Sequence, residues 1–381
     1  MSDFTNISSQ MASLPPSALP RLKAPEFQAK HQQLGGDNGF LGQPTTEVQL
    51  CPDQSGLYQH FQGGSLYWHD GHLHEIHGAI RDKWAVLGWE RSPLGYPVTD
   101  EMATPDGTGR YNHFQHGSIY WTPQTGAWEV HGAIRDKWAE LGWERSWLGY
   151  PISDETNFPE DGKVSVFEHG SIYWWPDTGA IELHDVAVHY TGIVCFGETD
   201  NDQLSSADEP YVVMGVINPT GTSTFRTQIY EGVDAGESRP DLIELYRGKP
   251  GGLTISVLFM EHDDGDPDKY KEAMQTAVGT AFTGITALIA IIPVVGPVIA
   301  GVIGPILSAV APTVGVELNR LLDTEDDVIG ETTLALTAKQ MIVLAARTAN
   351  SHEKGVGFKV STPLLSNFGA SYKAYFGVVP V

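Results

Sequence analysis

A repeat of 53 residues in the N-terminal half most constrains how this chain can fold. The same spacing separates the members of two aromatic sets: Phe61, Phe114 and Phe167, and Trp68, Trp121 and Trp174. A small unit that recurs at such a period cannot bury its own apolar face and must share a core with its neighbours. The repeats therefore predict a stacked array rather than one continuous core.

Each unit is expected to contain a short helix, a turn and a β-hairpin, in that order. Ile80, Trp84 and Leu87 fall on one helical face, and Gly88 follows as a helix-terminating residue. Matching tryptophans of this helical segment are predicted core residues: Trp84, Trp89, Trp138 and Trp143. The three units span 27–79, 80–133 and 134–185, after a flexible leader at 1–26.

A tetrapeptide recurs after each helix and carries a family resemblance. It reads Leu94-Gly95-Tyr96-Pro97 and Leu148-Gly149-Tyr150-Pro151, with a weaker copy at Leu41-Gly42-Gln43-Pro44. Residues 27–185 thus resemble the LGFP repeat family, which is named for Leu-Gly-Phe-Pro; Tyr replaces Phe in two copies. The resemblance implies a non-catalytic module that holds proteins of the actinobacterial envelope to cell-wall glycan.

Glycan contacts require an exposed aromatic ring beside polar groups. Trp128 and Trp175 are the candidate rings, because their positions are not shared by all copies. Asp100 and Asp154 recur after the turn, either as acceptors for sugar hydroxyls or as helix-capping acids.

A histidine cluster invites a metal interpretation: His69, His72, His74 and His77. Only His77 has counterparts in the other units, at His131 and His184, which favours a solvated hairpin over a metal site.

Residues 273–316 carry no charged side chain, although the formal charge of the chain is −24. Two arms, 273–292 and 298–316, flank a break at 293–297, and each arm would be about 30 Å long as a helix. Neither arm shows a polar stripe, so a helical hairpin at about 268–322 is expected to bury every face, in lipid or in protein. Its membrane-facing candidates are Ile289, Ile292, Val294, Val295, Val298 and Ile299.

Residues 186–381 otherwise predict an antiparallel β-sandwich, because short alternating runs are separated by polar turns. The expected strands are 187–196, 211–217, 224–230, 252–260, 331–337, 341–346 and 374–379. The overall fold class is therefore α+β and multidomain, with a repeat array followed by a sandwich that carries an inserted helical hairpin.

Three acidic clusters fall at predicted strand ends. They form either solvated loops or a calcium site. Asp208-Glu209-Pro210-Tyr211-Val212 is similar to the Asp-Pro-Tyr-Val segment of synaptotagmin-type, calcium-dependent phospholipid-binding domains. Asp326-Asp327-Val328-Ile329-Gly330-Glu331 is similar to the segment that closes their third calcium loop. The resemblance implies calcium ligands at Asp200, Asp202, Asp208, Glu261, Asp263, Asp326 and Asp327, with Glu261 where Asp is usual.

The excess of 47 acidic over 23 basic residues argues against a nucleic-acid partner. The first 25 residues lack a cleavable secretion signal, so we expect a chain made in soluble form that acts outside the producing cell after non-classical release. Cys51 and Cys195 are expected to be free thiols. No catalytic motif is present, so the chain is not expected to be an enzyme.

The sequence therefore predicts a binding protein of the cell envelope. It would hold a surface glycan through its repeats and perturb a lipid membrane through its sandwich, as a calcium-dependent toxin that forms pores as a homo-oligomer. The alternative is a non-lytic structural or adhesive protein, whose apolar hairpin is buried in the fold or in an oligomer interface.

Overall fold

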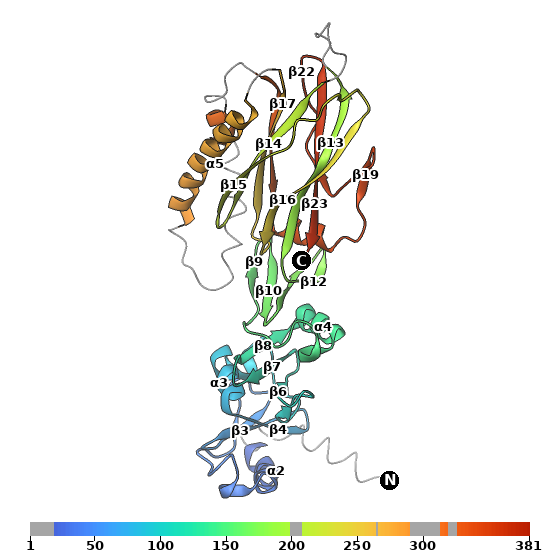
Figure 1. Ribbon diagram of the computed structural model, residues 1–381. Helices are drawn as coiled ribbons and strands as arrows, with labels where there is room; N and C mark the ends of the chain where they lie inside the picture. The colour runs from blue at the N-terminus through green and yellow to red at the C-terminus, as the bar shows by residue number, and fades with distance from the viewer. Residues whose placement is uncertain (1–18, 199–207, 264–265, 290–312, 319–325) are drawn as a thin grey trace. The chain divides into compact units, whose positions relative to one another are not determined.

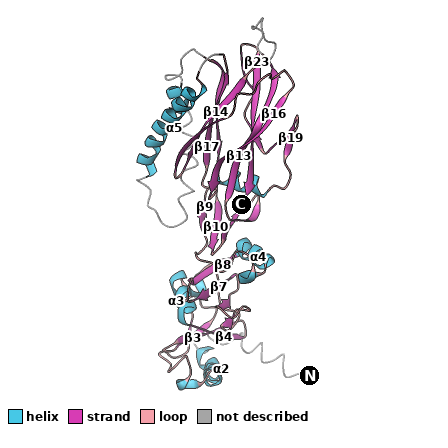
Figure 2. Ribbon diagram, viewed as in Figure 1, coloured by secondary structure: helices cyan, strands magenta, loops and turns pink. Residues whose placement is uncertain are grey.

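The computed structural model describes residues 19–198, 208–263, 266–289, 313–318 and 326–381 (Figure 1). The chain divides into two compact units: residues 1–156 with 164–172, and residues 157–163 with 173–381. Helices and strands occur in both units, as Figure 2 shows, and most strand pairings are antiparallel within small sheets. The predicted α+β class is confirmed.

Each repeat contains a four-stranded antiparallel sheet, which is larger than the expected hairpin. The first sheet comprises β1 (Gln49–Leu50), β2 (Leu57–His60), β3 (Gly64–His69) and β4 (His72–His77). The second comprises β5 (Met102–Ala103), β6 (Arg110–His113), β7 (Gly117–Thr122) and β8 (Gly126–His131). The third comprises β9 (Thr156–Phe158), β10 (Gly162–Phe167), β11 (Gly170–Trp175) and β12 (Gly179–Leu183).

Short helices alternate with these sheets. They are α2 (Leu19–Gln33), α3 (Gly78–Leu87) and α4 (Gly132–Leu141). Each is followed by a 3-10 helix: η2 (Gly36–Asn38) after α2, η3 (Trp89–Arg91) after α3 and η4 (Trp143–Arg145) after α4. The left-handed φ of Gly88, 108°, ends α3, a conformation that glycine adopts without a Cβ penalty.

Successive repeats share their cores. Trp84 of α3 is fully buried, and its ring centroid lies 4.7 Å from that of Tyr67 in the preceding repeat. Trp138 and Tyr120 repeat this contact at 4.7 Å. The shared core explains why one unit is insufficient by itself.

Two of the four predicted core tryptophans are placed differently from the prediction. Trp89 and Trp143 do not lie in α3 and α4: each follows the glycine that ends the α-helix, begins a 3-10 helix with a φ of 59° and is only partly buried. The spacing of these tryptophans from the start of the helix could not reveal that the α-helix ends one residue before the glycine.

The second unit contains a β-sandwich. One sheet has the order β15 (Gly221–Arg226), β14 (Pro210–Asn218), β17 (Leu253–Glu261), β18 (Asp327–Leu336). The other has the order β16 (Ser238–Gly248), β13 (Val186–Gly197), β23 (Ala370–Pro380), β21 (Val360–Ser361), with β22 (Leu365–Asn367) also on β23. A small hairpin pairs β19 (Ser351–Glu353) with β20 (Val356–Phe358).

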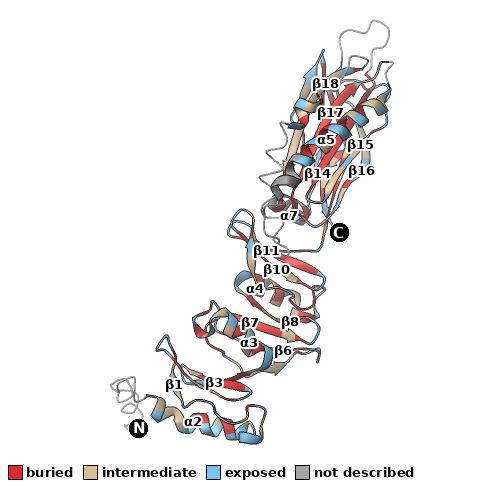
Figure 3. Cartoon of the chain, turned by 90° about the vertical axis from the view of Figure 1, so that its left-hand side faces the viewer, coloured by how far each residue is buried: buried red, intermediate tan, exposed pale blue. Residues whose placement is uncertain are grey.

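Strands β14 and β17 are covered on both faces, and Figure 3 shows them largely buried. One face meets the opposite sheet, where Phe259 stacks on Tyr372 at 5.8 Å. The other face lies under α5 (Pro267–Ile289), which runs beside β14 and β15 in Figure 1. Gly215 permits this approach, because a Cβ there would lie 2.4 Å from Val278.

The prediction that the first apolar arm has no polar face is wrong for the described part of α5. Its buried side packs into the sandwich: Tyr270, Met274, Ala277, Val278 and Ala281. Its exposed side carries Gln275, Thr276, Thr280 and Thr283. Each threonine hydroxyl donates a hydrogen bond to the carbonyl four residues earlier, at 2.9–3.0 Å. The helix is therefore amphipathic, with threonine as its polar residue.

The remaining predicted hairpin residues lie outside the described residues: Ile292, Val294, Val295, Val298 and Ile299. Ile289 ends α5, but its side chain is also outside them. Of the helices in the described ranges, none combines the length and the apolar character that a bilayer crossing requires.

Two strand assignments in the sandwich need correction. The predicted strand 341–346 belongs to helix α7 (Ala338–Ala346), which begins with a capping box between Thr337 and Gln340. Met341, Ile342 and Ala345 are buried together, a helical spacing that a six-residue apolar run does not distinguish from a strand. Strand β16 was not predicted, because most of its residues are exposed or half-buried and polar.

Candidate glycan and calcium sites

Asp154 and Trp128 lie at the junction between the second and third repeats. Lys83 forms an ion pair of 2.5 Å with Asp154, and its ammonium group lies 4.5 Å from the centroid of the Trp128 ring. The backbone N–H of Glu129 donates to the other oxygen of Asp154 at 3.2 Å. Asp154 of the third repeat therefore contacts both the helix and the sheet of the second repeat.

Asp100 does the same at the first junction. It pairs with Lys30 at 2.5 Å and accepts a hydrogen bond from the backbone N–H of Glu75 at 3.0 Å. Burial alone would raise the pKa of Asp100, but hydrogen bonds from His74, Lys30 and Glu75 hold it well below its ordinary value. The helix-capping interpretation of both aspartates is wrong, because a strand and not a helix begins two residues after each of them.

The two candidate tryptophans differ in exposure. Trp128 is half-buried, and its indole N–H donates to the carbonyl of Thr125 at 2.6 Å, so part of its ring faces solvent. Trp175 is fully buried, and its N–H donates to the carbonyl of Pro159 at 2.8 Å. Trp175 therefore presents no ring face to a glycan, and that candidate is wrong.

Trp147 meets the exposure criterion, and the sequence reasoning missed it. Its side chain is 47% exposed, directly before the turn Leu148–Pro151. Its counterparts in the other repeats are Phe40 and Pro93. Because the position is not shared by all copies, the criterion that selected Trp128 could also have found Trp147.

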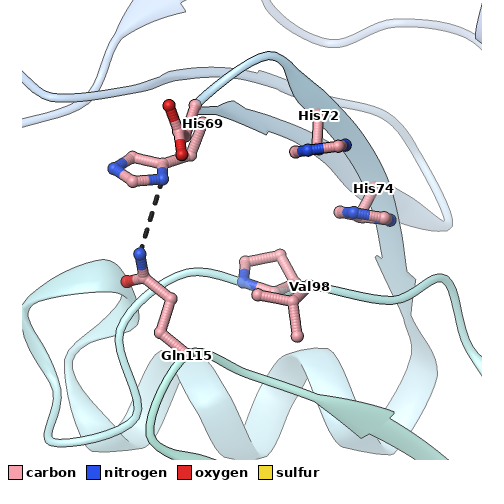
Figure 4. A pocket seen from close by; sticks show the side chains of 7 residues that line it. His69, His72, His74, Val98 and Gln115 are labelled. Carbon is pink, nitrogen blue, oxygen red and sulfur yellow. Dashed lines mark hydrogen bonds between the residues drawn. The ribbon is translucent and has the colours of Figure 1, made fainter.

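A cavity of about 340 Å³ lies at the first junction (Figure 4). Its lining residues are His69, Asp70, His72, His74, Pro97, Val98 and Gln115. The imidazoles of His72 and His74 lie along one wall, and His69 lies opposite them beside Gln115. Asp100 contacts this wall through His74, with 3.4 Å between the ring Nδ1 and the carboxylate.

The predicted calcium residues that the structure describes lie at one end of the β15-β14-β17-β18 sheet. Glu261 ends β17 and is paired in register with Pro210 on one side and Asp327 on the other. Asp208 and Asp326 are almost fully buried and accept hydrogen bonds at 2.7 Å from buried tyrosine hydroxyls, those of Tyr372 and Tyr211. Three acidic segments, distant in sequence, therefore meet at adjacent strand ends.

Glu261 is the most perturbed carboxyl of this group. Burial, with Asp208, Asp263 and Glu209 adding like charge, raises its pKa to about 8, although the Glu209 N–H hydrogen bond opposes the shift. Its Oε1 accepts that bond at 2.6 Å, and its Oε2 is buried with no partner among the described residues. The carboxyl is therefore largely neutral at pH 7, and a cation bound beside Oε2 would favour its ionised form.

The other predicted calcium ligands do not complete a coordination shell around Glu261. Asp200 and Asp202 lie outside the described residues, and Asp263 and Asp327 are exposed. Within the described ranges, no three of the predicted ligands bring their donor atoms within 4.8 Å of one another. The arrangement supplies a concentrated negative charge, and further oxygens are needed to complete six to eight ligands.

Cys51, Asp53 and Glu90 are the group of described residues whose donor atoms do lie that close. Burial raises the pKa of the Cys51 thiol to about 12, which disfavours the thiolate that a metal needs. The second repeat builds the same turn with Thr104 and Asp106, where the threonine hydroxyl donates to the carboxylate at 2.6 Å. This group therefore has a structural explanation. Cys51 and Cys195 are both free, as predicted.

The N-terminal fold thus defines a class of stacked modules, each with one helix, one tight turn and one small antiparallel sheet. Comparison with known families identifies them: residues 41–92, 94–146 and 148–188 match the LGFP repeat, so the chain carries three LGFP repeats. The matched segments begin at the leucine of each turn, 53 and 54 residues apart. No curated protein matches the chain. LGFP repeats indicate a protein associated with the cell surface or cell wall.

Proposed function

We propose that this protein binds an envelope glycan through its LGFP repeats and acts on lipid membranes through its sandwich, with calcium as the bridge to lipid. The observation that carries the membrane part is the convergence of three acidic strand ends around Glu261, with α5 beginning six residues later. A chain of charge −24 is repelled by anionic lipid unless a divalent cation bridges the two.

The acidic end of the sandwich is connected to α5. The backbone N–H of Asp326 donates to the hydroxyl of Tyr270 on α5 at 2.9 Å, and Asp326 also accepts from the N–H of Asp263 at 3.2 Å. A cation that draws these carboxylates together would change the contacts at the N-terminal end of α5, where Tyr270 lies. The uncharged sequence 290–312 follows this helix and supplies the apolar surface for insertion, as an oligomeric pore or as a lipid anchor.

Leakage of a dye from phosphatidylserine vesicles tests the membrane activity. The variants are one in which a Gly-Ser linker replaces residues 290–312, so that the packed part of α5 is kept, and Glu261→Gln, which retains the acceptor for the Glu209 N–H. Leakage is expected for the wild-type protein with calcium and not with a chelator, and at least about tenfold less leakage for both variants. Leakage that is absent in every condition, or equal for the linker variant, would refute the membrane activity.

Co-sedimentation with insoluble cell-wall polysaccharide tests the glycan part. Trp128→Ala and Trp147→Ala are expected to weaken retention at least about threefold, since each removes a partly exposed ring that can stack on a sugar. Phe368→Ala is the matched control, because Phe368 is a 53% exposed aromatic residue of the sandwich. Equal retention of all three variants and the wild type would show that neither Trp128 nor Trp147 takes part in glycan binding.

One observation favours a second function, that of a non-lytic structural or adhesive protein. Five residues of α5 are at most 2% exposed and pack against Tyr211 and Leu258 together with Val314 and Leu318. At about 1.5–3 kcal/mol per buried large apolar side chain, detaching α5 would be costly. This function predicts a protein that retains glycan binding and leaves vesicles intact with and without calcium.

A further inference from the structure

Three histidines share one face of the hairpin formed by β3 and β4. His69 and His72 are partners in register across the turn, and His74 follows His72 by two residues. Register partners and residues two apart point to the same side of a sheet. The three imidazoles therefore face one side, although only His69 and His72 are adjacent in register.

That side opens into the cavity at the first junction, as Figure 4 shows. His72 is exposed, and His69 and His74 are half-buried, so all three rings are accessible to a small solute. Asp70, at the turn of the same hairpin, adds a carboxylate to the lining.

Asp100 orients His74. The ring Nδ1 of His74 lies 3.4 Å from the carboxylate of Asp100, which Lys30 and the Glu75 backbone N–H hold in place. A histidine that donates its Nδ1–H to a carboxylate leaves the lone pair of Nε2 available, the arrangement found around protein-bound metals. Here that carboxylate is already fixed by the repeat junction.

The second junction shows that the fold itself does not need these histidines. Its hairpin pairs Thr122 with Gly126 and Tyr120 with Trp128, as the first pairs His69 with His72 and Tyr67 with His74. Thr122, Gly126 and Trp128 thus stand where the three histidines stand in the first repeat. The two sheets have the same strand order and the same clamping lysine and aspartate.

We propose that His69, His72 and His74 form a binding site for a zinc-class divalent transition metal, with Asp70 or water in the fourth position. Three imidazoles and one oxygen are a donor set that Zn²⁺ accepts in tetrahedral geometry. The donor atoms do not all lie within 4.8 Å of one another, so side-chain rotation must accompany binding. His72 is exposed, and the rotation of His69 would exchange its 3.5 Å contact with Gln115 and its stacking on Tyr96, at 4.2 Å, for a metal bond.

Titration calorimetry with Zn²⁺, together with the visible spectrum of bound Co²⁺, tests this site on the full chain without a polyhistidine tag. The wild-type protein is expected to bind one ion with a tetrahedral cobalt spectrum. The triple variant His69→Thr, His72→Gly, His74→Trp imports the residues of the second repeat, and it is expected to lose at least about a hundredfold in affinity. Circular dichroism and tryptophan emission establish that this variant is folded.

Two single variants distinguish other sources of binding. His169→Ala removes an exposed histidine outside the cavity and is expected to bind as the wild type does. Cys51→Thr imports Thr104 of the second repeat into the Cys51, Asp53 and Glu90 group and is also expected to bind normally. Loss of binding in Cys51→Thr with retention in the triple variant would overturn the proposal. The same is true if the wild-type protein binds no better than the triple variant.

Discussion

Replacing Glu261 with glutamine should remove a pH-dependent loss of stability from the sandwich. The pKa of Glu261 is raised to about 8 from 4.5, chiefly by burial. Between these two values the folded state holds a proton that the unfolded state releases, so stability falls as the pH rises. Below the unfolded pKa both states are protonated, and the contribution of this group no longer changes with pH.

The size of the effect follows from the same numbers. With a folded pKa of about 8 and an ordinary value of 4.5, linkage gives a loss of about 4 kcal/mol between pH 5 and pH 9. Solvent screening of a partly exposed side chain reduces this to about 2 kcal/mol. For a domain of this size the difference corresponds to about 4–8 °C in Tm.

Differential scanning calorimetry at pH 5 and pH 9 measures this difference. The Tm of Glu261→Gln should fall less than that of the wild type as the pH rises, so that the variant becomes the more stable protein at pH 9. Calcium should raise the Tm of the wild type at pH 9 and that of the variant much less, if the ion binds the charged carboxylate. Asp327→Asn, at an exposed neighbouring acid, is the control for the pH dependence in the absence of calcium, where it should follow the wild type. Identical pH dependence of Glu261→Gln and the wild type would refute the reasoning.

Three further predictions concern stability. Lys83→Met should lower the stability of the repeats by about 1–3 kcal/mol, because it leaves the partly buried Asp154 without its cation; urea denaturation followed by tryptophan emission measures it, and a wild-type midpoint would contradict the inter-repeat role. Gly149→Ala should cost about 1–3 kcal/mol in the same assay, since its φ is +71° and the new Cβ would lie 2.4 Å from the Glu168 carboxylate. Thr337→Ala should cost about 1 kcal/mol by removing the capping box of α7; an unchanged calorimetric transition would show that this cap contributes little.

The repeat period was sufficient to predict the architecture of the N-terminal array. Aromatic residues that recur at fixed spacing must meet across neighbouring units, and the Tyr67–Trp84 and Tyr120–Trp138 contacts show this. The same reasoning could not place Trp89 and Trp143, because a left-handed residue after a helix reverses the chain without any periodic signal. It also could not distinguish the buried Trp175 from the half-buried Trp128, since burial depends on which segments pack over each ring.

The uncharged segment 273–316 shows a second limit of prediction from sequence. Composition alone indicated a helix that had to bury every face, yet α5 exposes Thr276, Thr280 and Thr283. Threonine does not mark a polar face clearly, because its hydroxyl can be satisfied by its own helix. Whether a helix face is covered is decided by the sheet beside it.

The sequence by itself determined the number of repeats, their turns, the α+β class and the acidic character of the strand ends, because each of these is a local or periodic property. Only the tertiary structure decided that Asp100 and Asp154 join successive repeats, that three acidic segments meet around Glu261, and that His69, His72 and His74 face one cavity. Those arrangements depend on strand register and on which elements pack together, and side chains distant in the chain come into contact only after both are set.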